Sequence, residues 1–320
     1  MKVVVPGGSG QVGTLLARAY HARGDAVVVL SRNAATPSSA RPWRTVAWDA
    51  ETRGPWSAEL DGADVVINLA GRSVNCRYTA ANRTTIKESR IRSTRILGEV
   101  IASSVRPPRV WLQSSTATIY AHRYDAPNDE ATGIIGGNEP GAPDTWNFSI
   151  DVATSWEAAA DAVPLARTRL VKLRSAMVMS PDRDGIFDTL LTLVRRGLGG
   201  TSGDGRQFLS WIHEHDFIAA LDWIVAREHL SGAINIAAPN PLPNAEFMRA
   251  LRKAWGMPIG LPAMEWMLEI GAIAMQTETE LVLKSRRVVP GTLLADGFRF
   301  GQPTWPEAAA ELCARVRARA

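Results

Sequence analysis

Short apolar runs alternate with longer amphipathic segments along the first half of the chain. The runs are rich in valine, isoleucine or leucine, and they predict β-strands at 2–6, 26–31, 44–47, 64–69, 109–115 and 168–174. The amphipathic segments predict helices near 11–23, 81–104 and 148–162. Such alternation is typical of a parallel sheet with helices on both faces. We therefore predict an α/β fold with a doubly wound parallel sheet.

A glycine-rich loop joins the first predicted strand to the first predicted helix. Gly7, Gly10 and Gly13 have the spacing that binds a dinucleotide when it stands between a strand and a helix, as it does here. Gly7 permits the turn, Gly10 lets the backbone approach a pyrophosphate, and Gly13 lets helix and strand pack closely. The helix N-terminus then offers N–H groups to the phosphates. The cofactor-binding residues expected in this loop are Gly7, Ser9, Gly10, Gln11, Val12 and Gly13.

The end of the second predicted strand indicates which dinucleotide is bound. An NAD site has an acidic residue about 20 positions beyond the glycines, for the ribose 2′-hydroxyl. Ser31 and Arg32 occupy that place. A guanidinium and a hydroxyl bind a 2′-phosphate, which a carboxylate would repel. The sequence therefore predicts NADP(H), with a solvated surface arginine as the alternative interpretation of Arg32.

The fourth predicted strand, 64–69, runs into a loop that is also expected to contact the cofactor. Ligands of open α/β sheets bind at the carboxyl edge of the strands. Leu69, Ala70 and Gly71 stand at that edge. Together with the glycine loop, these residues predict a Rossmann domain.

After about residue 180 the alternation of strands and helices becomes less regular. The segment 197–205 contains five glycines and predicts a mobile loop, and 239–243 is rich in proline. A helix over 215–227 is expected to return to the sheet, and a helical pair is expected near 244–255 and 262–275. The predicted organisation is an NADP-binding Rossmann domain over 1–180 with 212–238 returning to it, a small substrate lobe of 181–211 and 239–300, and a C-terminal helix in 301–320.

The composition is that of an ordinary globular protein. The 320 residues are enough for a Rossmann domain and a smaller lobe, and 46% are hydrophobic and 21% charged. The net charge of +4 is modest, and Arg315, Arg317 and Arg319 are expected to end a helix rather than to bind nucleic acid. Cys76 and Cys313 lack metal-ligand spacing, which predicts free thiols in a reducing compartment and no metal site.

The chain is expected to be cytoplasmic and to have no contact with a membrane. Its first residues enter a strand at once, which predicts that no signal peptide precedes the fold. The apolar stretch Met264–Met275 is interrupted by Glu265 and Glu269 and is too short to span a bilayer. The expected partner is a small-molecule substrate, and both a monomer and a homodimer stay open.

Taken together, the motifs resemble those of a known superfamily. The glycine loop, Asn68–Gly71 and Ser114–Tyr120 resemble an extended short-chain dehydrogenase/reductase, the superfamily of nucleotide-sugar epimerases and dehydratases. More narrowly, the chain resembles the epimerase-like (YfcH-like) group, which carries a C-terminal domain of unknown function. The stretches that carry this narrower resemblance are Ser89–Arg95, Gly197–Gly200, Gly205–Gln207, Ser210–His213, Asn235–Pro241 and Gly297–Phe300. The resemblance also implies cofactor contacts from Ser114 and from Asp49, the latter at the adenine.

The superfamily transfers protons with a Tyr-x-x-x-Lys pair, and this chain lacks one. No tyrosine is followed by a lysine four residues on, and the matching positions hold Ser149 and Ala153. Neither side chain can serve as a phenolic acid or as the cation that tunes one. The catalytic candidates are therefore Thr116, at the superfamily's substrate-binding Ser/Thr position, Tyr120 and His213. The alternatives are an ordinary strand-end residue for Thr116, packing for Tyr120 and anchoring of the returning segment for His213.

Two functions of different classes stay open. The first is an NADP(H)-dependent oxidoreductase or epimerase-like enzyme with an unusual acid, acting on an unknown nucleotide-sugar or carbonyl substrate. The second is a non-catalytic NADP(H)-binding regulatory or partner-binding protein, which the missing pair favours. A deep polar pocket facing the nicotinamide would favour the enzyme, and a filled cleft would favour the binding protein.

Overall fold

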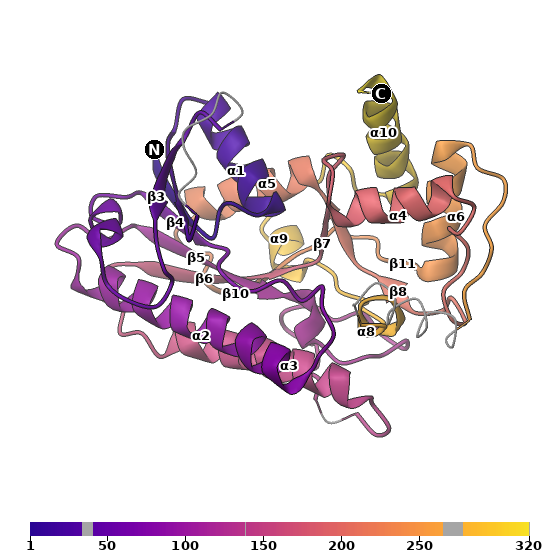
Figure 1. Cartoon of the computed structure of the whole chain (residues 1–320), viewed down its shortest axis with the longest axis horizontal. Helices are drawn as coiled ribbons and strands as arrows, with labels where there is room; N and C mark the ends of the chain where they lie inside the picture. Colours follow the sequence, from indigo (N-terminus) through magenta and orange to yellow (C-terminus); the bar gives the residue numbers. More distant parts are fainter. Residues whose placement is uncertain (34–40, 138, 265–277, 320) are drawn as a thin grey trace.

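A seven-stranded parallel sheet runs through the larger part of the molecule (Figure 1). The computed structural model describes residues 1–33, 41–137, 139–264 and 278–319. The strands are β1 (Lys2–Pro6), β2 (Ala26–Ser31), β3 (Arg44–Ala47), β4 (Val65–Asn68), β5 (Val110–Thr116), β6 (Arg169–Ser175) and β10 (Gly232–Ile236). They lie in the order β10-β6-β5-β4-β1-β2-β3, and every neighbouring pair is parallel. The predicted doubly wound sheet is confirmed.

The two faces of the sheet are buried in two separate cores. Val3 and Val5 pack on one face with apolar residues of α1 (Gln11–Ala22) and α5 (Glu214–Ala226). Val4 packs on the other face with residues of α2 (Ala80–Ser103) and α3 (Asp144–Asp161). Successive strand residues point to opposite faces, so a strand covered on both sides is apolar at every position. This explains the continuous valine runs in the sequence.

The order of the strands reverses beside β1. The chain moves outward from β1 through β2 to β3, and then crosses back to β4 on the other side of β1. The loops that follow β1 and β4 therefore leave the sheet in different directions and open a crevice between them. Ligands of doubly wound sheets bind in such a crevice.

A third core lies beside the sheet, in the right half of Figure 1. It is formed mainly by α4 (Ile186–Arg195), α6 (Asn244–Trp255) and α10 (Trp305–Ala318), with short β-pairs beneath them. These pairs are β7 (Met177–Met179) with β9 (Trp211–His213), and β8 (Phe208–Leu209) with β11 (Leu242–Pro243). We propose that this core defines the small lobe expected from the sequence, with α10 packed into it.

Most predicted elements lie within a few residues of their predicted bounds, but α4 and the strands β7 to β11 are not among the predictions. Helix α3 begins at Asp144 rather than near 148, because Pro143 stands at its N-cap and fixes the backbone for helix entry. Strand β10 is not among the predicted strands, since its five residues include Gly232 and a buried Asn235. The helix expected over 262–275 lies largely outside the described residues.

The glycine-rich segment 197–205 has defined backbone contacts. Leu261 N donates to Gly197 O, and Ala263 N donates to Thr201 O, both at 2.8 Å. The mobility expected of this segment stays a prediction. None of the helices formed by the described residues is long and apolar enough to cross a membrane.

Trp305 anchors α10 in the small-lobe core. Its indole is fully buried, stacks on the Phe247 ring with centroids 4.0 Å apart, and donates a 2.9 Å hydrogen bond to Phe247 O. Trp305→Ala is expected to lower the free energy of unfolding by about 3–5 kcal/mol, because it removes buried ring area and leaves a cavity. Urea denaturation measures this loss, and Trp305→Phe, which keeps a ring, should lose less. A loss below about 1 kcal/mol for the alanine variant would contradict this docking of α10.

Candidate functional site

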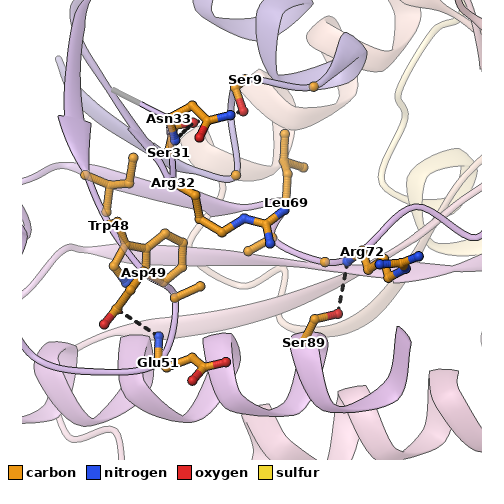
Figure 2. Close-up of a pocket in the computed structure, with 16 residues that line it drawn as sticks. Ser9, Ser31, Arg32, Asn33, Trp48, Asp49, Glu51, Leu69, Arg72 and Ser89 are labelled. Atoms are coloured by element: carbon orange, nitrogen blue, oxygen red, sulfur yellow. Dashed lines mark hydrogen bonds between the residues drawn. The ribbon is translucent and has the colours of Figure 1, made fainter. Parts of the chain in front are cut away.

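A cavity of about 300 Å³, the first pocket, lies at the carboxyl ends of β1, β2 and β4 (Figure 2). The predicted cofactor residues that line it are Gly7, Ser9, Gly10, Ser31, Arg32, Asp49, Leu69, Ala70 and Gly71. Gln11, Val12 and Gly13 begin α1 beside it, and Ser114 lies on β5; none of these four lines it. The structure thus brings the glycine loop, the end of β2 and the exit of β4 to one crevice.

The glycine loop packs directly against the exit of β4. Gly7 has φ +74°, and a Cβ atom there would lie 2.7 Å from Ala70 Cα, so both the turn and the contact require glycine. Gly13 packs on Gly8, where a Cβ would lie 2.3 Å from Gly8 Cα. Gly10 faces open space, since the nearest atom to a Cβ there is Gly7 O at 4.0 Å.

The N-terminus of α1 is available to an anion. Its N-cap residue, Gly10, has no side chain to accept from the N–H groups of the first turn, and that turn contains no acidic residue. The positive end of the helix dipole therefore lies beside the first pocket, which Gly10 lines. This arrangement suits a phosphate group.

The end of β2 presents polar groups to the same pocket. Ser31 Oγ donates to Ser9 Oγ at 3.1 Å and accepts from Asn33 N at 3.3 Å, which holds this strand end beside the glycine loop. Figure 2 shows the Arg32 side chain extended across the pocket from the end of β2. In the part of the chain that the structure describes, no carboxylate forms an ion pair with Arg32. Its guanidinium is thus available to a ligand.

Asp49 lies on the far side of the first pocket and is held by its own loop. Its carboxylate accepts from Glu51 N and Thr52 N, both at 3.0 Å, and from the Thr52 hydroxyl. The bonds from the Thr52 side chain and backbone lower the pKa of Asp49. A contact between Asp49 and an adenine stays a prediction. The neighbouring Trp48 is buried and packs against Trp56, with ring centroids 5.3 Å apart.

A second pocket, of about 220 Å³, lies beyond the carboxyl end of β5. Its apolar lining comes from Val74, Ile86, Val152 and Trp156, and its polar lining from Tyr78, Arg90, Ser115, Thr116, Thr118, Ser149 and Glu280. The residues come from the loop before α2, from α2 and α3, from the end of β5 and from the short helix α8 (Glu280–Leu283). The second pocket therefore combines the sheet edge with the C-terminal part of the chain.

Arg90 lies between the two pockets. Its Nη1 donates to Arg72 O at 3.0 Å and to Ile86 O at 2.9 Å, and its guanidinium lies over the Trp156 ring. A Cβ on Gly71, which lines the first pocket, would be 3.1 Å from Arg90 Cγ. Burial lowers the pKa of Arg90 to about 10. A half-buried cation therefore stands at the junction of the pockets, where it can contact an anionic or polar ligand group.

One of the three catalytic candidates, Thr116, lines the second pocket. Thr116 ends β5 and lines this pocket, and its Oγ1 accepts from Thr118 N at 3.1 Å. His213 is fully buried elsewhere, where its Nδ1 accepts from His215 N and caps α5, and its Nε2 lies 3.0 Å from Glu311 Oε2. Burial lowers the pKa of His213. This placement agrees with the anchoring role.

Tyr120 belongs to a buried network rather than to either pocket. Its hydroxyl donates to Asn235 Oδ1 and accepts from Arg174 Nη1, both at 2.9 Å. Arg174 also donates two bonds of 2.8 Å to Glu157, which accepts a third from Ser115 Oγ at 2.6 Å. Burial alone would raise the pKa of Glu157, but the bonds from Arg174 and Ser115 outweigh it and lower that pKa. This network holds the end of β5 against α3 and β6.

Several lining residues were not identified by the sequence analysis. Arg72 directly follows the predicted loop Leu69–Gly71, and Arg90 lies within a motif that carries the family resemblance, so local signals for both exist. Tyr78 is not a candidate from the sequence because no lysine follows it four residues on. Ser149 is named there only as the residue at the position of the missing tyrosine. Glu280 has no local signal, since only the fold brings it to Ser149, 131 residues away in the sequence.

Comparison with models of known protein families identifies the family of this chain. The model of the NAD dependent epimerase/dehydratase family matches residues 3–237. The chain belongs to this family. A domain of unknown function, DUF1731, matches residues 265–312. The family and the C-terminal domain expected from the sequence motifs are both confirmed.

Relatives of this family member cover nearly its whole length. Epimerase family protein SDR39U1 of Bos taurus is 33% identical over 318 residues, 98% of this chain and 100% of that protein. Epimerase family protein YfhF of Bacillus subtilis is 29% identical over 94% of each chain. The crystal structure of human SDR39U1 (isoform 2) with NADPH is 29% identical, with a TM-score of 0.83 over 98% of this chain and 99% of that one. UDP-N-acetylglucosamine 4-epimerase from Bacillus cereus, at 15% identity and TM-score 0.73 over 99% of each chain, shares the fold.

The hydrogen bonds of the Tyr120 hydroxyl predict that removing this group destabilises the fold. Tyr120→Phe is expected to lower the free energy of unfolding by about 1–3 kcal/mol, because Arg174 and Asn235 each lose a buried partner. Thermal or urea denaturation measures the change. A variant as stable as the parent would show that this hydroxyl does not bridge the two side chains.

Proposed function

We propose that this protein binds NADP(H) in the first pocket and acts as an oxidoreductase or epimerase-like enzyme on a small molecule in the second. The observation that carries the proposal is the end of β2, where Ser31 and Arg32 line the first pocket. A hydroxyl and a guanidinium recognise a ribose 2′-phosphate, whereas NAD sites have an acid there. The relative human SDR39U1, crystallised with NADPH, supports this cofactor.

The residues of the first pocket fit the other parts of a dinucleotide. The open space at Gly10 and the uncapped N-terminus of α1 suit the pyrophosphate. The exit of β4 at Ala70 and Gly71 leads from there toward Arg90 and the second pocket. When bound, the nicotinamide cofactor supplies or accepts a hydride. The protein orients the substrate and moves the accompanying proton.

The second pocket supports an enzyme over a protein that only binds NADP(H). A protein with no substrate needs no cavity beside its cofactor site, yet about 220 Å³ remain open at the end of β5. Thr116 can donate a hydrogen bond from its hydroxyl to a substrate oxygen there. The non-catalytic alternative rests on the missing Tyr-x-x-x-Lys pair, whose positions hold Ser149 and the buried Ala153.

The size of the second pocket favours a compact substrate. Ligand pockets commonly measure about 300–1,000 Å³, and this one, as lined by the described residues, is smaller. A small aldehyde or ketone fits that volume better than a nucleotide sugar. We therefore propose a carbonyl compound as substrate.

The cofactor assignment predicts the effect of reversing the charge at Arg32. Arg32→Asp is expected to weaken NADPH binding by about 2 kcal/mol, because repulsion replaces a charge-assisted bond to the 2′-phosphate. NADH, which lacks that phosphate, should bind no more weakly than before. Calorimetric titration of both cofactors measures the difference, and Arg167→Asp, on the loop before β6, is a control for the change in net charge. Equal affinities of the parent protein for NADPH and NADH would refute this preference.

The open space at Gly10 predicts that a larger side chain at this position abolishes NADPH binding. Gly10 has φ −75° and ψ 177°, a conformation that valine adopts without strain. Gly10→Val is therefore expected to fold normally but to lose NADPH binding, because its side chain fills the space of the pyrophosphate. Circular dichroism checks the fold, and calorimetry checks the binding. Normal NADPH affinity in this variant would mean that the phosphates bind elsewhere.

A further inference from the structure

The C-terminal domain of unknown function contributes a carboxyl group to the second pocket. Glu280 begins α8, lies within the segment 265–312 matched by that domain, and is 1% exposed. It lines the pocket together with Ser149 of α3. Ser149 Oγ donates to Glu280 Oε2 at 2.5 Å, and a protonated Glu280 can donate across the same contact. A hydroxyl and a carboxyl group are therefore directly linked at the pocket wall.

Ser149 stands at the position where the superfamily has its catalytic tyrosine. The wall of the second pocket thus carries a hydroxyl at the place of the missing phenol, with Thr116 across the same cavity. The Tyr78 hydroxyl also bonds to Ser149, but burial raises the pKa of Tyr78 to about 12. Tyr78 is therefore a poor acid near neutral pH, and Ser149 needs another source for its proton.

We propose that Ser149 and Glu280 together replace the tyrosine and lysine as the proton donor of the second pocket, with a compact aldehyde or ketone as substrate. This inference rests on the proposed function and assigns a catalytic role to the domain of unknown function. Ser149 contacts the substrate oxygen, and Glu280 supplies the proton that Ser149 passes on. Thr116 orients the same oxygen from the end of β5.

The proton steps balance in carbonyl reduction. The reductant is NADPH, which when bound would supply the hydride for the carbonyl carbon. As the π-electron pair moves to the carbonyl oxygen, that oxygen takes the proton of the Ser149 hydroxyl. The Ser149 oxygen takes the proton of the Glu280 carboxyl group in the same step. Glu280 is left as a carboxylate and regains a proton from solvent after the alcohol leaves.

The surroundings of Glu280 keep a proton on it at higher pH than on an ordinary glutamate. Burial is the largest influence and raises its pKa, and Glu278 acts in the same direction. Arg286, whose Nη2 lies 3.7 Å from Glu280 Oε1, and Lys284 oppose this in part. Among the described residues, Glu280 Oε1 has no hydrogen-bond partner, which a neutral carboxyl group tolerates better than a carboxylate.

Groups on the other walls of the pocket complete this environment. Tyr78, from the loop before α2, and Arg90, from α2, line the same cavity. Tyr78 is neutral at physiological pH, and the Arg90 guanidinium is engaged by backbone oxygens and the Trp156 ring. Ser149, from α3, is hydrogen-bonded to the Glu280 carboxyl group and lines the cavity, so a direct proton path leads from that group to the cavity.

The segment that carries Glu280 is anchored beside Thr116. Lys284 Nζ donates to Thr118 O at 2.8 Å, and Arg286 Nε donates to Thr118 Oγ1 at 3.0 Å. Arg286 Nη2 also donates to Glu280 O at 3.2 Å. These bonds fix the acid relative to the end of β5, as proton transfer requires.

The first test follows the proton on Glu280 without cofactor or substrate. Carbon-13 NMR of the full chain labelled at glutamate carboxyl groups, with Glu280→Gln to assign the resonance, should show Glu280 titrating well above the usual value of about 4.3. Ser149→Ala should raise this pKa further, because the carboxylate loses a donor. An ordinary pKa, or one unaffected by Ser149→Ala, would overturn the proposal.

The second test measures NADPH oxidation with benzaldehyde, cyclohexanone and 2,3-butanedione. The rate of the parent should fall as pH rises through the raised pKa of Glu280, because the acid form is required. Glu280→Gln and Ser149→Ala should each lower the rate about 100-fold, and Glu280→Gln should also remove this alkaline fall. Ser149→Thr, which keeps a hydroxyl, should restore part of the rate, and Ser155→Ala on the same helix is the matched control.

Calorimetry separates this proposal from the proposed function. All of these variants should bind NADPH within twofold of the parent, since neither Ser149 nor Glu280 lines the first pocket. A parent that fails to bind NADPH, or that reduces none of the three carbonyl compounds, would count against the proposed function. A parent that reduces one of them, with Glu280→Gln retaining its rate and pH profile, would overturn the assignment of Glu280.

Discussion

The contact between the glycine loop and the exit of β4 is the constraint on which both pockets depend. Gly7 and Ala70 approach so closely that a single added Cβ would lie 2.7 Å from backbone. This contact brings the ends of β1 and β4 together where the strand order reverses, and it leaves the N-terminus of α1 facing the crevice. Because β5 pairs with β4 in fixed register, Thr116 is placed relative to that crevice as well. A shift of one residue in the register of a strand would turn each of its side chains to the wrong face of the sheet.

Buried polar groups make this edge of the sheet rigid. Asn68 donates to Gln113 at 2.8 Å across β4 and β5, and Trp156 of α3 donates to Thr94 of α2 at 3.0 Å. The Glu157–Arg174 pair adds a charged link. A buried polar group costs free energy unless it is paired, so each of these bonds specifies one arrangement of its partners. The helix that carries Ser149 is thereby held against the strand that carries Thr116.

The sequence predicts the parts of the site that are formed by residues close together in the chain, but not the parts formed by residues that only the fold brings together. The glycine loop and the end of β2 could be identified because their function follows from spacing along one β-α-β unit. Tyr120 and His213 are candidate acids in the sequence because a sequence does not show burial. In the structure, the Tyr120 hydroxyl donates to Asn235, and the His213 ring contacts Glu311. Glu280 could not be found, since its place beside Ser149 depends on how the C-terminal segment crosses the sheet edge.

The buried charges of that C-terminal segment explain why it folds together with the sheet. Lys284 is fully buried and Arg286 nearly so, and burial lowers the pKa of Lys284 to about 8. Taking such cations out of water costs several kcal/mol each unless partners compensate. Their partners, Thr118 O and Thr118 Oγ1, belong to the turn that follows β5, and Glu280 lies beside them. Lys284 Nζ and Arg286 Nε therefore gain these two hydrogen bonds only when the segment docks on the turn after β5, and docking carries Glu280 into the second pocket. Stability and the placement of the acid thus depend on the same contacts.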